Sequence, residues 1–211
     1  MTPLLSIFAA MIKNLIFDFG KVLVDYDYLQ LLNPYFDSKN EREEFSRCIL
    51  TDRWLQVLEV ENQPFEKTIS DMKSAYPQFT RQINVYSERY CDFVTGEVPG
   101  MRQLLAELKE RGYKLYGLSN WCSKVYVTLG QYPEIFSLLD GRIISCEEHV
   151  MKPKAEIYNI LLERFGLNAG ECLFTDDRLV NIDGARAVGM DGVVFHDAAQ
   201  FRQELAMRSI L

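Results

Sequence analysis

Short apolar runs alternate with helical stretches along most of this chain, and the alternation limits the possible folds more than any other feature of the sequence. Between successive runs, apolar residues recur at the three- and four-residue spacing of a helix that buries one face. Strands separated by helices in this order form a parallel sheet with helices on both faces. We therefore predict a doubly wound α/β fold whose five strands lie at residues 15–17, 113–119, 141–145, 171–177 and 192–195.

Residues 27–95 depart from the alternation, because they show little strand signal and several helical stripes. Ser38 and Glu41 have the spacing of a capping box at a helix start. Pro64 suits the first turn of a second helix, and Thr80 is a candidate cap for a third. This part of the chain is therefore predicted to be a helical block.

The length and composition of the chain fit one core with a modest insertion. The chain has 211 residues, and 48% of them are hydrophobic, which is enough for a sizeable core but short for two large domains. We predict that residues 11–26 and 96–211 form the α/β core and that residues 27–95 form an inserted helical domain. The first ten residues are interpreted as a short extension ahead of Met11.

The charge and the cysteines of the chain restrict its partners and its location. The formal net charge is −7 and no Lys or Arg cluster is present, so a nucleic-acid partner is not expected. No run approaches the ~20 apolar residues that a membrane helix needs, so no membrane partner is expected either. The five cysteines are odd in number and form no Cys-x-x-Cys pair. Such cysteines are typical of a reducing compartment, and we predict a cytoplasmic protein.

Polar residues stand at the points where the predicted strands end. In a doubly wound sheet, ligands bind beyond the carboxyl ends of the strands, so these residues are the candidates for a functional site. In chain order they are Asp18, Ser119–Asn120 and Asp176–Asp177, and the loop after the third strand leads to Lys152–Pro153.

Four segments around these residues resemble the haloacid dehalogenase superfamily. They are "FDFGKVLVDYD", "LSN", "MKPKAEIY" and "FTDDRLVNIDGA", and they look like the bacterial branch that includes α-glucose-1-phosphate phosphatases. The resemblance extends from about Met11 to the C-terminus. It implies that the helical block is a small cap inserted after the first strand, and that the protein hydrolyses a small phosphorylated molecule with the help of Mg²⁺.

The residue types at the predicted site fit this chemistry. Carboxylates that converge on one point repel each other unless a cation lies between them, and hard oxygen ligands favour Mg²⁺. We expect Asp18 to be the nucleophile that forms an aspartyl-phosphate, and also a metal ligand. Asp177 is the second expected ligand, and Asp176 is expected to act through water or to orient Lys152. Catalytic and substrate-binding contacts to the phosphate oxygens are expected from Ser119, Asn120 and Lys152.

Gly20 occupies the position at which most phosphatases of this superfamily carry a second aspartate. By the resemblance, the backbone carbonyl of that residue binds the metal and its side chain protonates the leaving group. Glycine keeps the carbonyl and lacks the acid. We therefore expect a preference for leaving groups that are stable anions, as in anomeric sugar 1-phosphates, aryl phosphates or acyl phosphates.

Alternatives to a sugar-phosphate phosphatase follow from the same residues. A 2-haloacid dehalogenase uses the same aspartate without a metal, but it has no cation to neutralise Asp176 and Asp177. A weakened phospho-ligand binder is suggested by Gly20. Asn181 is expected to support the metal site, Trp121 either lines the substrate entrance or packs under the cap, and His149 is expected to be structural. The physiological substrate and the oligomeric state are not predicted.

Overall fold

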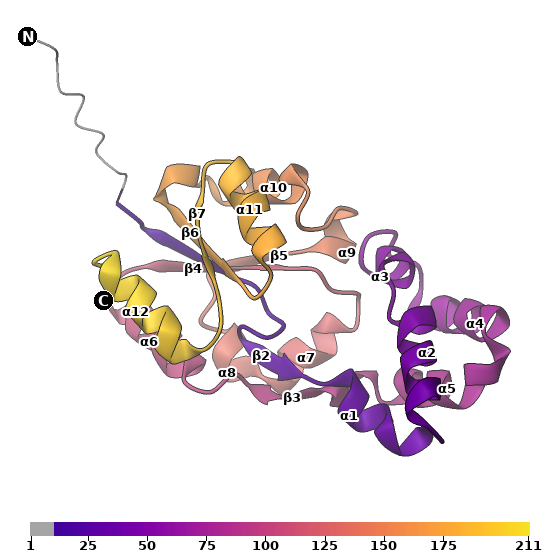
Figure 1. Ribbon diagram of the computed structural model, residues 1–211. Coiled ribbons are helices and arrows are strands. Elements are labelled where there is room, and N and C mark those ends of the chain that lie inside the picture. Colours follow the sequence, from indigo (N-terminus) through magenta and orange to yellow (C-terminus); the bar gives the residue numbers. More distant parts are fainter. Residues whose placement is uncertain (1–10) are drawn as a thin grey trace, which may run out of the picture.

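Five parallel strands form the central sheet of the computed structural model, which describes residues 11–211 (Figure 1). Their order across the sheet is β5-β4-β1-β6-β7, and every neighbouring pair is parallel. Each strand lies within one residue of its predicted ends, so the predicted strands and fold class are confirmed. The strands are β1 (Asn14–Phe17), β4 (Lys114–Ser119), β5 (Gly141–Ile144), β6 (Cys172–Asp176) and β7 (Asp191–Val194).

Helices cover both faces of the sheet, because side chains of successive strand residues point to opposite faces. Leu15 and Phe17 of β1 belong to an apolar cluster with α6 and α12, whereas Ile16 belongs to a second cluster with α10 and α11. In Figure 1, α10 and α11 lie above the sheet and α6 and α12 lie below it. The helices of this part are α6 (Met101–Glu110), α7 (Val125–Gln131), α8 (Pro133–Phe136), α9 (Ser145–Glu148), α10 (Ala155–Phe165), α11 (Leu179–Ala187) and α12 (Ala198–Met207).

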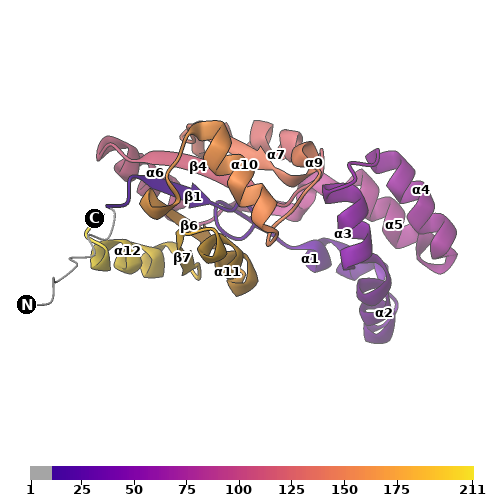
Figure 2. The ribbon, with the colours of Figure 1, turned by 90° about the horizontal axis from the view of Figure 1, so that it is seen from above.

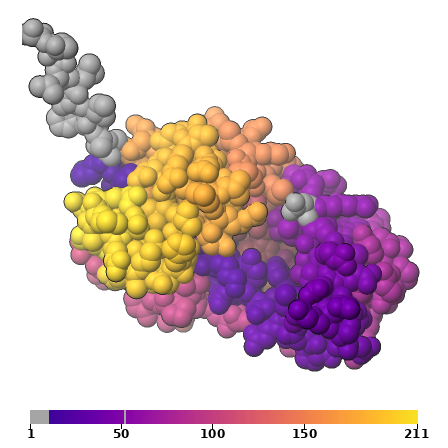
Figure 3. All heavy atoms as spheres, in the orientation of Figure 1, coloured from indigo at the N-terminus to yellow at the C-terminus, as the bar shows by residue number. Residues whose placement is uncertain are grey.

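A helical block follows β1 and lies beyond the carboxyl ends of the sheet strands (Figures 1 and 2). In the space-filling view it forms the purple and magenta end of the molecule, opposite the yellow C-terminal helix (Figure 3). Apolar side chains of the block and of the sheet belong to one continuous cluster, so the two parts share a core. Its helices are α1 (Tyr28–Leu32), α2 (Lys39–Ile49), α3 (Asp52–Glu59), α4 (Phe65–Ala75) and α5 (Thr80–Glu88).

The predicted helix starts in this block have different outcomes. Ser38 caps α2 by accepting a hydrogen bond from the Glu41 amide at 3.1 Å, as predicted. Pro64 immediately precedes the first residue of α4. The prediction for Thr80 is wrong, because Thr80 is already the first residue of α5 and its hydroxyl donates to the Pro77 carbonyl. A 3₁₀ turn at Pro77–Phe79 leads directly into α5, so no side-chain cap is needed there.

A two-stranded antiparallel ribbon joins the block to the sheet domain, and the sequence analysis missed it. It pairs β2 (Val24–Tyr26) with β3 (Val94–Glu97). Next to it, the Asp27 amide donates to the Phe93 carbonyl at 2.9 Å. The two connections of the helical block therefore leave the rest of the fold side by side, close to the predicted boundaries. The division into two domains itself stays a prediction.

Within residues 11–211, the structure contains no helix that is both long enough and apolar enough to span a bilayer. The extension predicted ahead of Met11 lies outside the described residues.

Candidate active site

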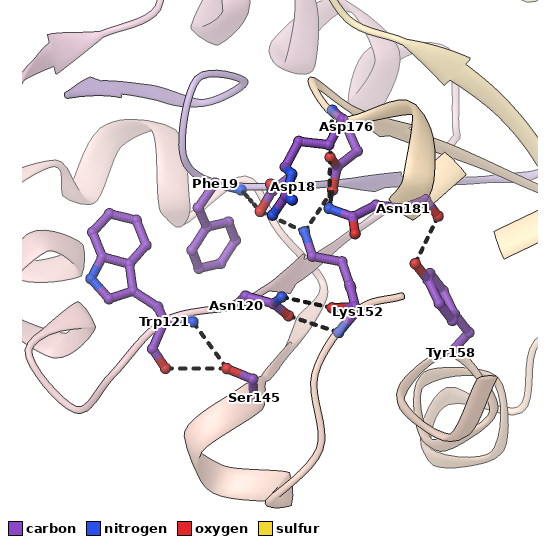
Figure 4. Close-up of polar contacts among 10 residues, drawn as sticks. Asp18, Phe19, Asn120, Trp121, Ser145, Lys152, Tyr158, Asp176 and Asn181 are labelled. Carbon is purple, nitrogen blue, oxygen red and sulfur yellow. Dashed lines mark hydrogen bonds and ion pairs between the residues drawn. The ribbon is translucent and has the colours of Figure 1, made fainter. Parts of the chain in front are cut away.

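Three neighbouring strands end at one place and deliver polar side chains to it (Figure 4). β1 lies at the centre of the sheet, between β4 and β6. Asp18 directly follows β1, Ser119 is the last residue of β4, and Asp176 is the last residue of β6. The Asp18 amide donates to the Thr175 carbonyl at 3.0 Å, which keeps Asp18 beside the end of β6. The ends of β4, β1 and β6 therefore lie side by side, as the sequence predicted.

Lys152 lies between two of the predicted carboxylates. Its ammonium nitrogen is 2.8 Å from Asp18 Oδ1 and 2.7 Å from Asp176 Oδ2, and the residue is only 2% exposed. Burial would lower the pKa of Lys152, but the two carboxylates outweigh this effect and raise it above its ordinary value. Lys152 therefore stays positively charged beside Asp18. Burial also raises the pKa of Asp18, to about 7, although Lys152 opposes the rise.

Asn120 holds the backbone of Lys152 in place. The Asn120 side-chain oxygen accepts from the Lys152 amide at 2.9 Å, and the side-chain nitrogen donates to the Lys152 carbonyl at 3.0 Å. The side-chain amide of Asn120 therefore binds the Lys152 backbone with the same two hydrogen bonds that the backbone of a neighbouring strand residue would make. These contacts support a positioning role for Asn120, and the substrate contact expected for it stays a prediction.

Asp176 is fully enclosed by hydrogen-bond donors. Oδ1 accepts from the Arg178 amide at 2.8 Å and from Asn181 Nδ2 at 3.0 Å, and Oδ2 accepts from Asn181 Nδ2 at 3.0 Å as well as from Lys152. The Asn181 carbonyl in turn accepts from the Tyr158 hydroxyl at 2.7 Å. Because a carboxylate has about four lone-pair positions, these contacts favour the second role predicted for Asp176, the orientation of Lys152.

Asp177 is the more open acidic residue of the pair. It is exposed, and one oxygen from each of Asp18, Asp176 and Asp177 lies within 4.8 Å of the other two. Three converging carboxylates with a single lysine between two of them offer hard oxygen ligands to a divalent cation. The residues present therefore fit Mg²⁺, with Asp18 and Asp177 as the side chains best placed to hold it.

A pocket of about 200 Å³ opens above these residues, between the strand ends and the helical block. Ser119, Trp121 and Gly20 line it, as do Asp18 and Lys152. The Ser119 hydroxyl makes no hydrogen bond to other residues in the described part of the chain, so it can bind a ligand oxygen. On the side of the helical block the lining is mostly apolar or aromatic: Tyr28, Ile49, Leu50, Trp54, Leu55, Leu58, Met72, Tyr86 and Tyr90.

A larger side chain at Gly20 would require the Tyr26 ring to move, because that ring fills the adjacent space. A Cβ atom added at Gly20 would lie 2.7 Å from Tyr26 Cε1, closer than such atoms approach in proteins. Tyr26 was not singled out by the sequence analysis. The only signal that pointed to it was its position two residues after the second apolar run.

Two further pocket residues were also missed. Glu59 at the end of α3 and Arg178 after β6 both line the pocket. Glu59 is one of thirty acidic residues in the chain, and nothing in its neighbourhood distinguishes it before the block is folded over the sheet. Arg178 directly follows the predicted acidic pair Asp176–Asp177, and this position was the one sequence signal that it lies near the site.

Comparisons with known proteins show the family to which this chain is similar. The haloacid dehalogenase-like hydrolase family matches residues 12–189. A sesquiterpene phosphatase of Aspergillus oryzae is 30% identical over 92% of this chain and 94% of its own length. A D-ribitol-5-phosphate phosphatase of Bacteroides thetaiotaomicron is 23% identical over 93% of this chain and 98% of its own.

Solved structures agree in fold. The crystal structure of a haloacid dehalogenase family enzyme from Bacteroides thetaiotaomicron has a TM-score of 0.74 to this chain and is 19% identical, covering 92% of this chain and 98% of the other. A second structure of that enzyme, in complex with magnesium and inorganic phosphate, has a TM-score of 0.69 at 20% identity and covers 89% of this chain and 96% of the other.

Proposed function

The chain belongs to the haloacid dehalogenase-like hydrolases, and on this premise we propose that it is a Mg²⁺-dependent phosphatase of small phosphomonoesters. The relatives that cover nearly the whole chain are named as phosphatases, and a structural neighbour binds magnesium and inorganic phosphate. The observation that carries the proposal is the cluster in which Lys152 touches Asp18 while Asp18 and Asp177 leave a site for a cation.

The residues divide the reaction between them. Asp18 attacks phosphorus with a carboxylate oxygen, the ester bond to the leaving oxygen breaks, and an aspartyl-phosphate forms. Lys152 and the Ser119 hydroxyl bind the phosphoryl oxygens as charge moves onto them. Asp176 and Asn120 keep Lys152 in position. Mg²⁺, held by Asp18, Asp177 and the Gly20 carbonyl, would neutralise the charge between the carboxylates and the phosphate. Water then cleaves the bond between Asp18 and phosphorus.

The organic part of the substrate is proposed to be largely apolar. The pocket wall contributed by the helical block consists mainly of aliphatic and aromatic side chains. A polyol bound there would lose water contacts without gaining equivalent hydrogen bonds, whereas an apolar group would gain by burial. The relative from Aspergillus oryzae, named for a sesquiterpene substrate, is consistent with this assignment. A prenyl or aryl phosphate therefore fits the pocket best.

A sugar phosphate, as expected from the sequence, is the second candidate. The ribitol-phosphate phosphatase of Bacteroides thetaiotaomicron favours it, and Asn120, Glu59 and Arg178 supply polar groups to the pocket. The dehalogenase alternative is disfavoured by the acidic cluster, which needs a cation.

A substrate panel tests the proposal. We expect Mg²⁺-dependent hydrolysis that EDTA abolishes, with kcat/KM at least about tenfold higher for geranyl phosphate than for glucose 1-phosphate or ribitol 5-phosphate. Halide release without metal would instead indicate a dehalogenase, and phosphate binding without turnover would indicate a binder.

A matched pair of variants tests the apolar wall. Leu55 and Leu29 are both 36% exposed, but only Leu55 lines the pocket. Leu55→Gln should lower kcat/KM for geranyl phosphate about tenfold and leave glucose 1-phosphate unchanged, and Leu29→Gln should change neither. A higher rate with the sugar phosphates in the wild type would contradict the apolar assignment.

A further inference from the structure

The residues assigned to the reaction so far include no proton donor for the leaving oxygen. Gly20 has no side chain, and the Tyr26 ring occupies the space that a side chain at Gly20 would need. Lys152 is held by two carboxylates, and Asp176 has its oxygens occupied by donors. An alkoxide is a poor leaving group, so hydrolysis of an alkyl or prenyl phosphate needs an acid from elsewhere.

Glu59 is the one carboxyl group on the pocket wall that lies outside the predicted metal cluster, among the residues that line the pocket. It is the last residue of α3, and Leu55 and Leu58 of the same helix also line the pocket. Residues three and four apart share one helix face, so Glu59 belongs to the face of α3 that lines the pocket. The charges of Lys152, Asp18 and Arg178 act on it. It is partly buried, and its carboxyl makes no hydrogen bond or ion pair with another residue of the described part of the chain.

The end of α3 is fixed against the sheet domain. His149, which follows α9, donates from Nδ1 to the carbonyl of Val60 at 2.9 Å, and Val60 directly follows Glu59. α3 and α9 also pack against each other. The position of Glu59 relative to Asp18 is therefore set by a contact between the helical block and the strand ends, not by the helix alone.

We propose that Glu59 is the acid and base of this active site: it protonates the leaving oxygen and then takes a proton from the attacking water. The inference rests on the proposed phosphatase function. In the first step, the bond from phosphorus to the leaving oxygen breaks as Asp18 attacks, and the Glu59 proton passes to that oxygen to give the alcohol. In the second step, water attacks phosphorus and gives its proton to the Glu59 carboxylate. Inorganic phosphate leaves, and Asp18 and protonated Glu59 are restored.

The charges around Glu59 suit this role. Burial raises the pKa of Glu59 to about 7, with Lys152 and Arg178 opposing the rise and Asp18 adding to it. A group with such a pKa exchanges protons efficiently near neutral pH. The pocket tyrosines do not exchange protons near neutral pH, since burial raises the pKa of Tyr26 to about 12 and that of Tyr86 well above 10.0. Burial raises the pKa of Tyr28, Cys122 and Cys146 above their ordinary values, and the charge of Glu59 adds to each rise.

The effect of losing Glu59 on kcat/KM should depend on the leaving group, so two esters with different leaving groups test the proposal. Glu59→Gln keeps the shape of the side chain and removes its proton. With Mg²⁺ present, we expect kcat/KM for hexyl phosphate to fall at least about 10²-fold, mainly in kcat, because general acid catalysis contributes roughly 10²–10⁴-fold. kcat/KM for 4-nitrophenyl phosphate, whose leaving group is a stable anion, should stay within about threefold of wild type, because this constant includes only the steps up to the aspartyl-phosphate, and the retained value also verifies folding. kcat should fall with both esters, since the Glu59 carboxylate activates the water in the second step of each reaction.

Matched variants complete the test. Glu59→Asp should restore part of the hexyl phosphate activity. Glu61→Gln, two residues further along and exposed, should resemble wild type with both esters. The fall in kcat of the wild type with hexyl phosphate above pH 7 should disappear in Glu59→Gln. Equal losses of kcat/KM with both esters, or no loss with hexyl phosphate, would overturn the assignment of Glu59 alone. Failure of the wild-type chain to hydrolyse either ester would overturn the phosphatase proposal and this inference together.

Discussion

A single lysine organises the charged residues of the site. Lys152 is in contact with Asp18 and Asp176, and the three side chains are almost completely buried. Removing one partner of a buried ion pair is costly when it leaves the other charge alone. Here the lysine has two carboxylates, so it keeps one of them when the other is changed. The arrangement allows the nucleophile to be altered without leaving a buried charge unpaired.

Asp18→Asn tests the nucleophile on this basis. The amide cannot attack phosphorus, so we expect turnover to fall below a few per cent of wild type. The fold should persist, because Lys152 retains Asp176. Initial rates with 4-nitrophenyl phosphate and the urea unfolding midpoint are the two measurements. A variant that keeps a larger share of the rate, after contaminating phosphatase is excluded, would place the nucleophile elsewhere.

Glu59 should make the stability of the metal-free protein depend on pH. The pKa of Glu59 rises from an ordinary value of 4.5 in the unfolded chain to about 7 in the folded protein, so the folded state binds the proton more tightly. Its contribution to stability is fully present below pH 4.5 and is lost as the pH rises through 7. Glu59→Gln should therefore be more stable than wild type at pH 8 by about 1–3 kcal/mol, and similar to it at pH 4.5.

Urea unfolding in EDTA at the two pH values measures this difference, with Glu61→Gln as the exposed control. Equal stability of Glu59→Gln and wild type at pH 8 would mean that the folded protein does not disfavour the Glu59 charge.

At the scale of elements, the contact between α3 and α9 joins the helical block to the catalytic edge. His149 has a positive φ of 56° and donates to the Val60 carbonyl. Glycine adopts this backbone conformation readily but lacks the donor, whereas asparagine tolerates it and keeps a side-chain amide. The pair His149→Gly and His149→Asn therefore separates the hydrogen bond from the backbone conformation.

His149→Gly should loosen the end of α3. Loss of the hydrogen bond is worth about 1 kcal/mol, so we expect amide exchange at Val60 and Glu61 to accelerate about fivefold. kcat/KM for hexyl phosphate should fall severalfold, while 4-nitrophenyl phosphate is affected less, because its leaving group does not depend on Glu59. His149→Asn should lie between His149→Gly and wild type. Unchanged exchange in His149→Gly would show that packing alone holds α3.

Some helices and strands could be predicted from the sequence and others could not. The strands of the sheet were predictable because each contains short apolar segments with buried side chains, and the spacing of Ser38 and Glu41 indicated the start of α2. β2 and β3 were not predictable, because each is short and its partner lies across the whole helical block. Thr80 was misjudged because a 3₁₀ turn, which has no strong residue signature, starts α5.

The residues of the candidate site also differ in how far the sequence predicts them. The sequence predicted Asp18, Ser119, Asp176 and Asp177 as candidates because they stand at strand ends. It predicted Lys152 because it belongs to a recognisable segment in the loop after the third strand. The different contacts of Asn120 and Asp176 required the structure, because both depend on where Lys152 lies. Glu59 reaches the site only because the helical block packs over the strand ends, and the local sequence around Glu59 does not show this packing. Tyr26 reaches Gly20 through the turn between β1 and β2, and the analysis did not predict that turn.

At the scale of the whole molecule, three carboxylates meet at the edge of the sheet in a chain that is already negatively charged. A cation bound there would relieve repulsion mainly in the folded state, since Asp18 is far from the adjacent pair Asp176–Asp177 in the unfolded chain. Mg²⁺ should therefore stabilise the whole fold by mass action, in proportion to its affinity for the folded protein. This stabilisation can be measured without any substrate.

Mg²⁺ at about one hundred times its dissociation constant should raise the free energy of unfolding by about 2.7 kcal/mol. For a chain of this size that corresponds to a rise in Tm of roughly 5–10 °C. Asp177→Ala should remove most of the rise and increase the Mg²⁺ concentration needed for half-maximal activity, because Asp177 is the open ligand of the cluster. Asp183→Ala, which removes an exposed carboxylate of α11 paired only with Arg186, should keep the full rise. If Mg²⁺ stabilised Asp177→Ala and wild type equally, the cation would bind outside the cluster of Asp18, Asp176 and Asp177.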